Sequence, residues 1–146
     1  MMENVKISFF FLRLPIAISL AGHGLVRLPK LQEFADGMVS NMEESILPSA
    51  AVLGFSYFIP IAEAIIGIVL LLGIQVRYTI FAGLALMALL TFGSSTIENW
   101  SAVESQLIHA GYLMLLFWYW SDKHGTTSHH AGVVSGFRTS ESDRAD

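Results

Sequence analysis

The sequence predicts an all-α integral membrane protein: a four-helix transmembrane bundle with a short amphipathic interfacial helix between the first and second spans. Only 14% of the 146 residues are charged and 53% are hydrophobic, whereas about 25% of a typical soluble domain is charged. The apolar residues gather in runs about as long as a bilayer-spanning helix, roughly 20 residues. Such spans must be helical, because a lone strand leaves its backbone groups unpaired in hydrocarbon.

The spans are bounded by residues that oppose insertion into lipid. The first covers about 7–28 and stops before Pro29 and Lys30. We expect it to be retained, since Arg13 interrupts the apolar core that a cleaved signal needs. The other three spans cover about 53–73, 78–97 and 105–120. Residues 1–121 are therefore expected to form one membrane domain.

Two segments outside the spans are more polar. Between the first two spans, Phe34, Met38 and Met42 recur at helical spacing among acidic and amide side chains. This pattern favours an amphipathic helix on the membrane surface over a loop packed on the bundle. Residues 122–146 are rich in His, Gly, Ser and Thr, a composition typical of a disordered tail.

The distribution of basic residues predicts the orientation. Arg27 and Lys30 flank the spans on one side. Five basic residues flank them on the other, namely Lys6, Arg77, Lys123, Arg138 and Arg144. Because basic flanks stay inside, we expect both termini in the cytoplasm and a multi-pass protein of the bacterial inner membrane.

The composition also excludes several kinds of chemistry. The chain has no cysteine, so it can form neither a disulfide nor a cysteine-bound iron–sulfur cluster. Any redox role must use a borrowed cofactor or a partner. The net charge of −4 gives no basic surface for nucleic acid, and we expect no nucleic-acid partner.

Glu63 is the most informative residue, because it lies ten positions into the second span and hence near the bilayer midplane. An acid at that depth costs roughly 3 kcal/mol, so it should face the bundle interior and be paired or protonated. Ser56, Pro60 and Gly67 share its helical face. Arg13 is the predicted partner, within about 6 Å in depth; the alternative is that Arg13 extends to the cytoplasmic headgroups.

His23 in the first span and His109 in the fourth fall at a similar depth. With Glu63 they could frame a polar cavity open toward the outer half of the membrane. Alternatively, each histidine is hydrogen-bonded to a backbone carbonyl. The further groups expected around the cavity are Tyr57, Thr91, Gln106 and Tyr112. A metal site is not predicted, because the three groups come from different helices without an i, i+4 pair.

The pattern resembles the DoxX family of small four-helix membrane proteins over about residues 12–120. The residues that carry the resemblance are Arg13-Leu14, Gly22-His23-Gly24-Leu25, Ile61-Ala62-Glu63, Gly67 and Leu70-Leu71-Leu72-Gly73. The family includes the membrane subunit of a thiosulfate:quinone oxidoreductase. The resemblance therefore implies a bound quinone or a similar lipophilic molecule, and a soluble redox partner protein that donates electrons.

The resemblance also implies roles for the polar residues. Glu63, His23 and His109 would take up or deliver protons. The cofactor-binding residues would be Arg13, Tyr57, Gln106 and Tyr112. The alternative function is a non-catalytic membrane scaffold or small-molecule carrier whose buried polar residues only fix the helix register. A proton-coupled transporter is disfavoured, since four spans without a repeat leave little room for alternating access. A homo-oligomeric assembly is compatible with the sequence.

Overall fold

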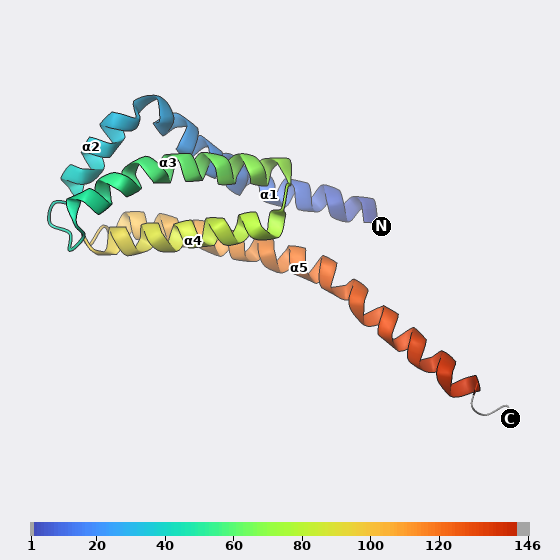
Figure 1. Ribbon diagram of the computed structural model, residues 1–146. Coiled ribbons are helices and arrows are strands. Elements are labelled where there is room, and N and C mark those ends of the chain that lie inside the picture. The colour runs from blue at the N-terminus through green and yellow to red at the C-terminus, as the bar shows by residue number, and fades with distance from the viewer. Residues whose placement is uncertain (1, 143–146) are drawn as a thin grey trace.

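The computed structural model describes the backbone of residues 2–142 and the side chains of residues 7–122. Within these limits every regular element is helical, as the sequence predicts (Figure 1). The elements are α1 (Met2–Arg27), the 3₁₀ turn η1 (Leu28–Lys30), α2 (Leu31–Asn41), α3 (Ser49–Leu72), α4 (Val76–Ser95) and α5 (Trp100–Ser142).

Three apolar stretches in the described part of the chain are long enough to cross a membrane. They are Ile7–Asn41, Ser49–Leu72 and Val76–Ser95. These are the spans of a multi-pass membrane protein, and they include the first three predicted ones. The predicted fourth span, 105–120, lies in α5, whose described part falls outside this set. Polar side chains such as Glu104, Gln106 and His109 occupy its first turns.

The first predicted span ends where the sequence indicates. Arg27 is in the last turn of α1, and η1 follows with a proline in its first turn. Because proline lacks a backbone N–H, the α-helical ladder is interrupted there. Figure 1 shows α1 bending at this point into α2.

The segment between the first two spans is a helix, as its periodicity predicts. α2 packs against α3 and buries Ala35. The hydroxyl of Tyr57 on α3 donates a hydrogen bond of 2.5 Å to Oε1 of Gln32 on α2. This bond attaches α2 to the N-terminal half of α3.

A short turn joins α3 to α4. Gly73 adopts a left-handed conformation with φ of 75° and donates its N–H to the carbonyls of Val69 and Leu70. Glycine suits this position because a side chain is disfavoured there. Gln75 is also left-handed, with φ of 46°, and α4 begins at the next residue.

α5 is longer than the predicted fourth span. It begins at Trp100 and continues as helix to Ser142, through most of the segment whose composition predicts disorder. Figure 1 shows the C-terminal part of this helix pointing away from the other four. Residues 143–146 of the predicted tail lie outside the described residues.

The helices form two layers, α1 with α3 and α4 with α5 (Figure 1). The first layer is tightly packed, because a Cβ at Gly24 would overlap the backbone of Ala64, and one at Gly67 would overlap that of Ala21. Small residues allow such approach in membrane proteins. The buried core between the layers consists of Ile16, Ala17, Leu20, Ile59, Leu70, Ile80, Leu86, Met87, Leu113 and Leu116.

The outward faces of the helices are apolar. On α1, Phe11 and Ile18 are exposed, and on α3 the same holds for Phe58 and Ile65. Continuous apolar surface of this kind is rare on soluble monomers. It is the surface that a bilayer requires, so the exposed side chains agree with the three apolar spans.

Candidate functional site

A polar cavity of about 280 Å³ lies where the C-terminal turns of α1 meet α3, α4 and the first turns of α5. Its polar lining residues are His23, Arg27, Glu63, Ser94, Ser105, Gln106 and His109. The apolar lining comes mainly from α2, α3 and α4. The cavity therefore brings together four ionisable side chains from three helices: His23, Arg27, Glu63 and His109.

Glu63 is buried and paired, as its depth in the second span predicts. Its side chain is 4% exposed, and its Oε2 lies 2.5 Å from Nη1 of Arg27, whose side chain is 31% exposed. The Arg27 guanidinium also lies 4.9 Å from the ring centroid of Phe34 on α2. A charge-assisted hydrogen bond thus joins α1 to α3 at the back of the cavity, and a cation–π contact joins α1 to α2.

The predicted pairing of Glu63 with Arg13 is wrong. Nη2 of Arg13 donates to the carbonyl of Leu71, at 3.4 Å, and the guanidinium lies 5.3 Å from the ring centroid of Phe10. Arg13 is therefore at the C-terminal end of α3, where a helix favours a cation. It neither pairs with Glu63 nor lines the polar cavity.

The register of α1 against α3 explains this correction. The two helices are antiparallel, with Gly24 against Ala64 and Gly67 against Ala21. Residues near the end of α1 consequently lie opposite Glu63, whereas the start of α1 lies opposite the end of α3. The predicted depths assume a different alignment of the two spans.

The two predicted histidines lie close together. The ring centroids of His23 and His109 are 5.7 Å apart and the rings are tilted by 39°. Glu63, which is buried, lines the same cavity, whereas His23 is exposed. The cavity thus combines a buried carboxylate with a histidine at the surface.

The hydrogen bonds of His109 define its tautomer. Nδ1 is 2.8 Å from the carbonyl oxygen of Ser105, and Nε2 is 2.9 Å from Oγ of Ser19. A carbonyl only accepts, so Nδ1 carries the hydrogen, and in the neutral ring Nε2 accepts from the Ser19 hydroxyl. The expected bond to a backbone carbonyl is therefore present, and the same residue also lines the cavity.

The side-chain oxygen of Gln106 is a hydrogen-bond acceptor that has no donor within the described residues. Its Nε2 donates to Oγ of Ser94, at 2.9 Å. Its Oε1 is buried, and no donor in the described part of the chain reaches it. Buried acceptors of this kind are rare, and a ligand donor is one explanation for them.

The two predicted tyrosines do not line the polar cavity. Tyr57 donates to Gln32, as described above. The hydroxyl of Tyr112 donates to the carbonyl of Leu12, at 2.8 Å, and so joins α5 to α1 away from the cavity. Of the predicted site residues, His23, Glu63, Gln106 and His109 come together, and Arg13, Tyr57 and Tyr112 do not.

Arg27 is a functional candidate that was not predicted from the sequence, where it counts only as one of the basic residues that flank the spans. One signal could have found it, because it follows His23 by four residues and so shares its helical face. Phe34 is missed for another reason, since it comes from the helix that was assigned to the membrane surface.

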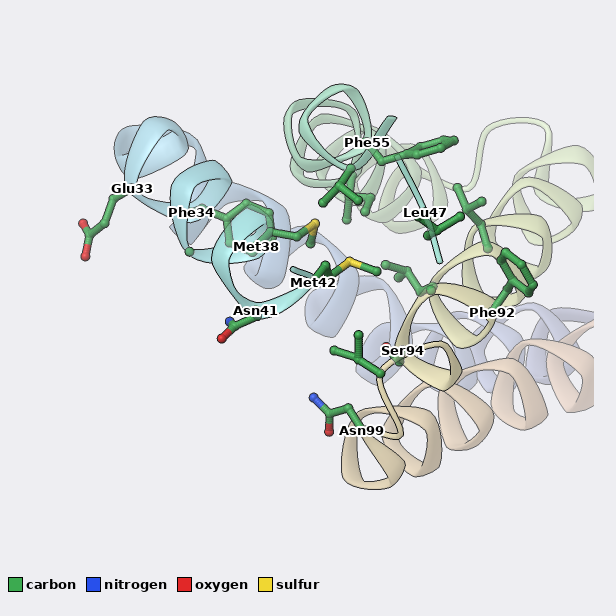
Figure 2. Close-up of a pocket in the computed structure, with 17 residues that line it drawn as sticks. Glu33, Phe34, Met38, Asn41, Met42, Leu47, Phe55, Phe92, Ser94 and Asn99 are labelled. Atoms are coloured by element: carbon green, nitrogen blue, oxygen red, sulfur yellow. The ribbon is translucent and has the colours of Figure 1, made fainter. Parts of the chain in front are cut away.

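A second cavity, of about 360 Å³, adjoins the polar one (Figure 2). Its lining is mostly apolar and comes from α2, α3, α4 and the loops that follow α2 and α4. Five residues line both cavities: Phe34, Met38, Ile59, Leu90 and Ser94. The polar cavity and the apolar one are therefore neighbours that share part of their lining.

Comparison of the chain with protein-family models, with curated proteins and with solved structures gives no match. The cavities and the residues that line them are therefore the features that bear on function.

Proposed function

We propose that this protein is a DoxX-like, four-span membrane protein that binds a quinone, or a similar lipophilic molecule, in the polar cavity. It would serve as the membrane subunit of a redox system. The observation that carries the proposal is the convergence of His23, Glu63, Gln106 and His109 in one cavity of an otherwise apolar bundle. Apolar pockets with a few convergent polar groups are typical ligand sites.

The fourth span of this proposal is α5. It packs along α4, and it exposes large apolar side chains as α1 and α3 do. These are Leu107, Ile108, Met114, Leu115 and Trp118. A bilayer would accommodate this surface, and water would not.

The proposed orientation is supported by the charged residues at the two ends of the bundle. Arg13 and Arg77 lie at the end where α3 turns into α4. The opposite end, which holds the cavity, carries two flanking basic residues, Arg27 and Lys30, against the five that the sequence places on the other side. It also carries the acidic residues Glu33, Asp36, Glu43, Glu44, Glu98 and Glu104. The proposal places the termini in the cytoplasm of a bacterial cell, with α2 at the outer surface of its inner membrane.

The polar lining suits the two redox forms of a quinone. A quinone supplies a two-electron, two-proton couple whose oxidised form accepts hydrogen bonds and whose reduced form also donates them. Arg27 and a protonated histidine can donate to a carbonyl oxygen. The buried Oε1 of Gln106 can accept from a hydroxyl. The site thus offers partners to both forms.

Each polar residue has a distinct proposed task. His109 is fixed by Ser19 and Ser105, and with the exposed His23 it would carry protons between the surface and the cavity. Glu63 would balance the charge of Arg27 and take up a proton. Because the chain has no cysteine, a soluble partner protein would have to donate the electrons.

The test is mass spectrometry of the lipids that copurify with the protein in a mild detergent. We expect a stoichiometric quinone with the wild type and little with Glu63→Gln. Arg13→Gln is the matched control, because it changes a half-buried charged residue outside the cavity. If Glu63→Gln does not fold, the double variant Arg27→Gln, Glu63→Gln removes both charges together.

A second candidate function is a non-catalytic scaffold or small-molecule carrier. It is favoured by the bonds that hold helices together, such as Arg27 to Glu63 and Tyr112 to Leu12. In that case Glu63→Gln would lower stability without changing the bound lipids. Absence of a quinone from the wild-type protein would favour this second function.

A further inference from the structure

The apolar cavity has the shape of a chain-binding compartment beside the polar one. Figure 2 shows Phe34, Met38 and Met42 of the α2 segment on one side, with Phe55 and Phe92 on another. Most of its lining is hydrocarbon or thioether, and none of these side chains is basic. It therefore suits a hydrocarbon chain better than an ionic head group.

The two cavities lie side by side and share lining residues. Phe34, Met38, Ile59 and Leu90 line both, and all four are apolar. Methionine is unbranched and adapts easily to the shape of a neighbour. Together the two cavities fall within the roughly 300–1,000 Å³ of ordinary ligand pockets. An amphiphile can thus place its head in one cavity and its chain in the other.

The apolar cavity also reaches the lipid-facing surface. Phe55 on α3 is 40% exposed and Phe92 on α4 is 54% exposed. Figure 2 shows the two rings on the same side of the cavity, with Leu47 between them. In a bilayer, the exposed faces of these two rings contact the hydrocarbon of the lipids, and Leu47 is the side chain that a ligand chain has to displace to pass between them.

We propose that the apolar cavity holds the hydrocarbon chain of the amphiphile whose head group occupies the polar cavity, and that this chain passes between Phe55 and Phe92 into the lipid. This inference rests on the proposed function and adds the ligand class to it: a quinone-type head with a single linear chain. The ligand would enter sideways from the membrane and not from water.

The apolar cavity is expected to select among ligands by the shape of their hydrocarbon chain. A chain in the bilayer is already out of water, so its transfer into the protein brings little hydrophobic free energy. The binding free energy of the chain therefore comes mainly from close packing against the protein, which depends on the shape of the cavity. A side chain that fills the compartment should therefore exclude the chain and leave the head site intact.

Gly93 on α4 provides the filling variant. It lines the apolar cavity and not the polar one. A Cβ there would meet only Cε of Met42, at 3.7 Å, an ordinary contact with the end of a flexible side chain. The Cβ of Gly93→Leu is thus accommodated without displacing backbone, and we expect the rest of the leucine side chain to take up space in the cavity.

Gly111→Leu on α5 is the matched control. A Cβ at Gly111 meets nothing within 4 Å, and the residue lines neither cavity. Both substitutions replace a helical glycine by leucine, so they gain the same helix propensity. A difference in ligand binding between the two variants is then due to the filling of the apolar cavity.

The experiment measures binding of two probes to the protein in phosphatidylcholine nanodiscs by microscale thermophoresis, with empty nanodiscs as the blank. One probe is a dimethoxy-methyl-benzoquinone without a chain, and the other has the same ring with a decyl chain. For Gly93→Leu we expect the decyl probe to bind about tenfold more weakly, a loss of one decade in Kd. The chain-free probe should bind equally to all three proteins, and Gly111→Leu should match the wild type.

Three outcomes would overturn the inference. Equal affinity of Gly93→Leu and wild type for the decyl probe would show that the chain lies elsewhere. Equal weakening of both probes would show that the cavity holds no separate chain. If neither probe binds the wild type, the proposed function itself fails, and the inference fails with it.

A second measurement locates the chain directly. The decyl probe carries a diazirine at the end of its chain, and the residues labelled on irradiation are identified by mass spectrometry. We expect labels on Met42 or Phe92. Labels confined to the outward face of α5 would contradict the proposed path.

Discussion

Arg27, in the last turn of α1, and Glu63, in the middle of α3, form an ion pair whose carboxylate is almost fully buried. The pair joins two helices that are separated in the chain by α2 and its loops. Removing Arg27 leaves the Glu63 carboxylate buried without compensation. Replacing both members by apolar groups avoids that cost.

We therefore expect Arg27→Ala to lower the free energy of unfolding by about 3 kcal/mol. The double variant Arg27→Met, Glu63→Leu should lose about 1 kcal/mol or less, because no charge remains in the interior. Thermal unfolding in detergent, followed by circular dichroism, provides the comparison. If Arg27→Ala were as stable as the wild type, the pair would have no structural role.

Arg13, unlike Arg27, lies outside both cavities and is not paired with Glu63. Its guanidinium lies at the C-terminal end of α3, against the carbonyl of Leu71. Arg13→Gln should lower the unfolding free energy by about 1 kcal/mol through the lost charge–dipole interaction. Quinone binding should be unchanged, since Arg13 lies outside both cavities. A loss of quinone from the lipids that copurify with this variant would show that Arg13 contributes to quinone binding.

The close approach of α1 and α3 predicts a steric effect. Gly67→Leu would force a side chain against the backbone of Ala21, and we expect a loss of about 3 kcal/mol or more. Gly22→Leu is the control, because a Cβ at Gly22 meets nothing within 4 Å. Size-exclusion profiles after heating to graded temperatures distinguish the two variants. Equal heat resistance of Gly67→Leu and Gly22→Leu would show that α1 and α3 do not make their close contact at Gly67.

The hydrogen bonds of His109 predict a spectroscopic signature. Nitrogen NMR of labelled histidine should show the tautomer with hydrogen on Nδ1, because the Ser105 carbonyl accepts from that atom. Ser19→Ala removes the donor to Nε2 and should cost about 1 kcal/mol. It should also shift the Nε2 resonance and leave that of Nδ1 nearly in place. A spectrum dominated by hydrogen on Nε2 would contradict this geometry.

The bond between Tyr57 and Gln32 predicts how firmly α2 is held. Tyr57→Phe should raise amide hydrogen exchange in residues 31–41, because a bond that attaches α2 to α3 is lost. Tyr78→Phe, at an exposed tyrosine on α4, should leave that exchange unchanged. Mass spectrometry after exchange in detergent measures both.

The sequence predicts much of this fold because lipid leaves the backbone few choices. Long apolar runs have to be helices, so α1, α3 and α4 begin and end within a few residues of the predicted limits. The burial of Glu63 follows from the same reasoning, since a carboxylate at that depth cannot face hydrocarbon. The pairing of His23 with His109 follows from their similar depth.

The partner of Glu63 could not be predicted in the same way. It depends on the register of α1 against α3, which the contacts of Gly24 and Gly67 determine. The sequence shows these small residues but not which neighbours they meet. Tyr112 illustrates a related limit, because depth alone does not reveal that its hydroxyl bonds to the carbonyl of Leu12.

The turn at Gly73 has a mechanical consequence for the cavity. It joins the α1–α3 layer to the α4–α5 layer at the end of the bundle opposite to the one where Ser94 and Ala102 line the cavity, and the bond between Tyr112 and Leu12 lies toward the same end as Gly73. A small tilt of one layer about this pivot displaces the opposite end most, because displacement grows with distance from the axis. The width of the polar cavity is thus the dimension of this molecule most sensitive to such a tilt.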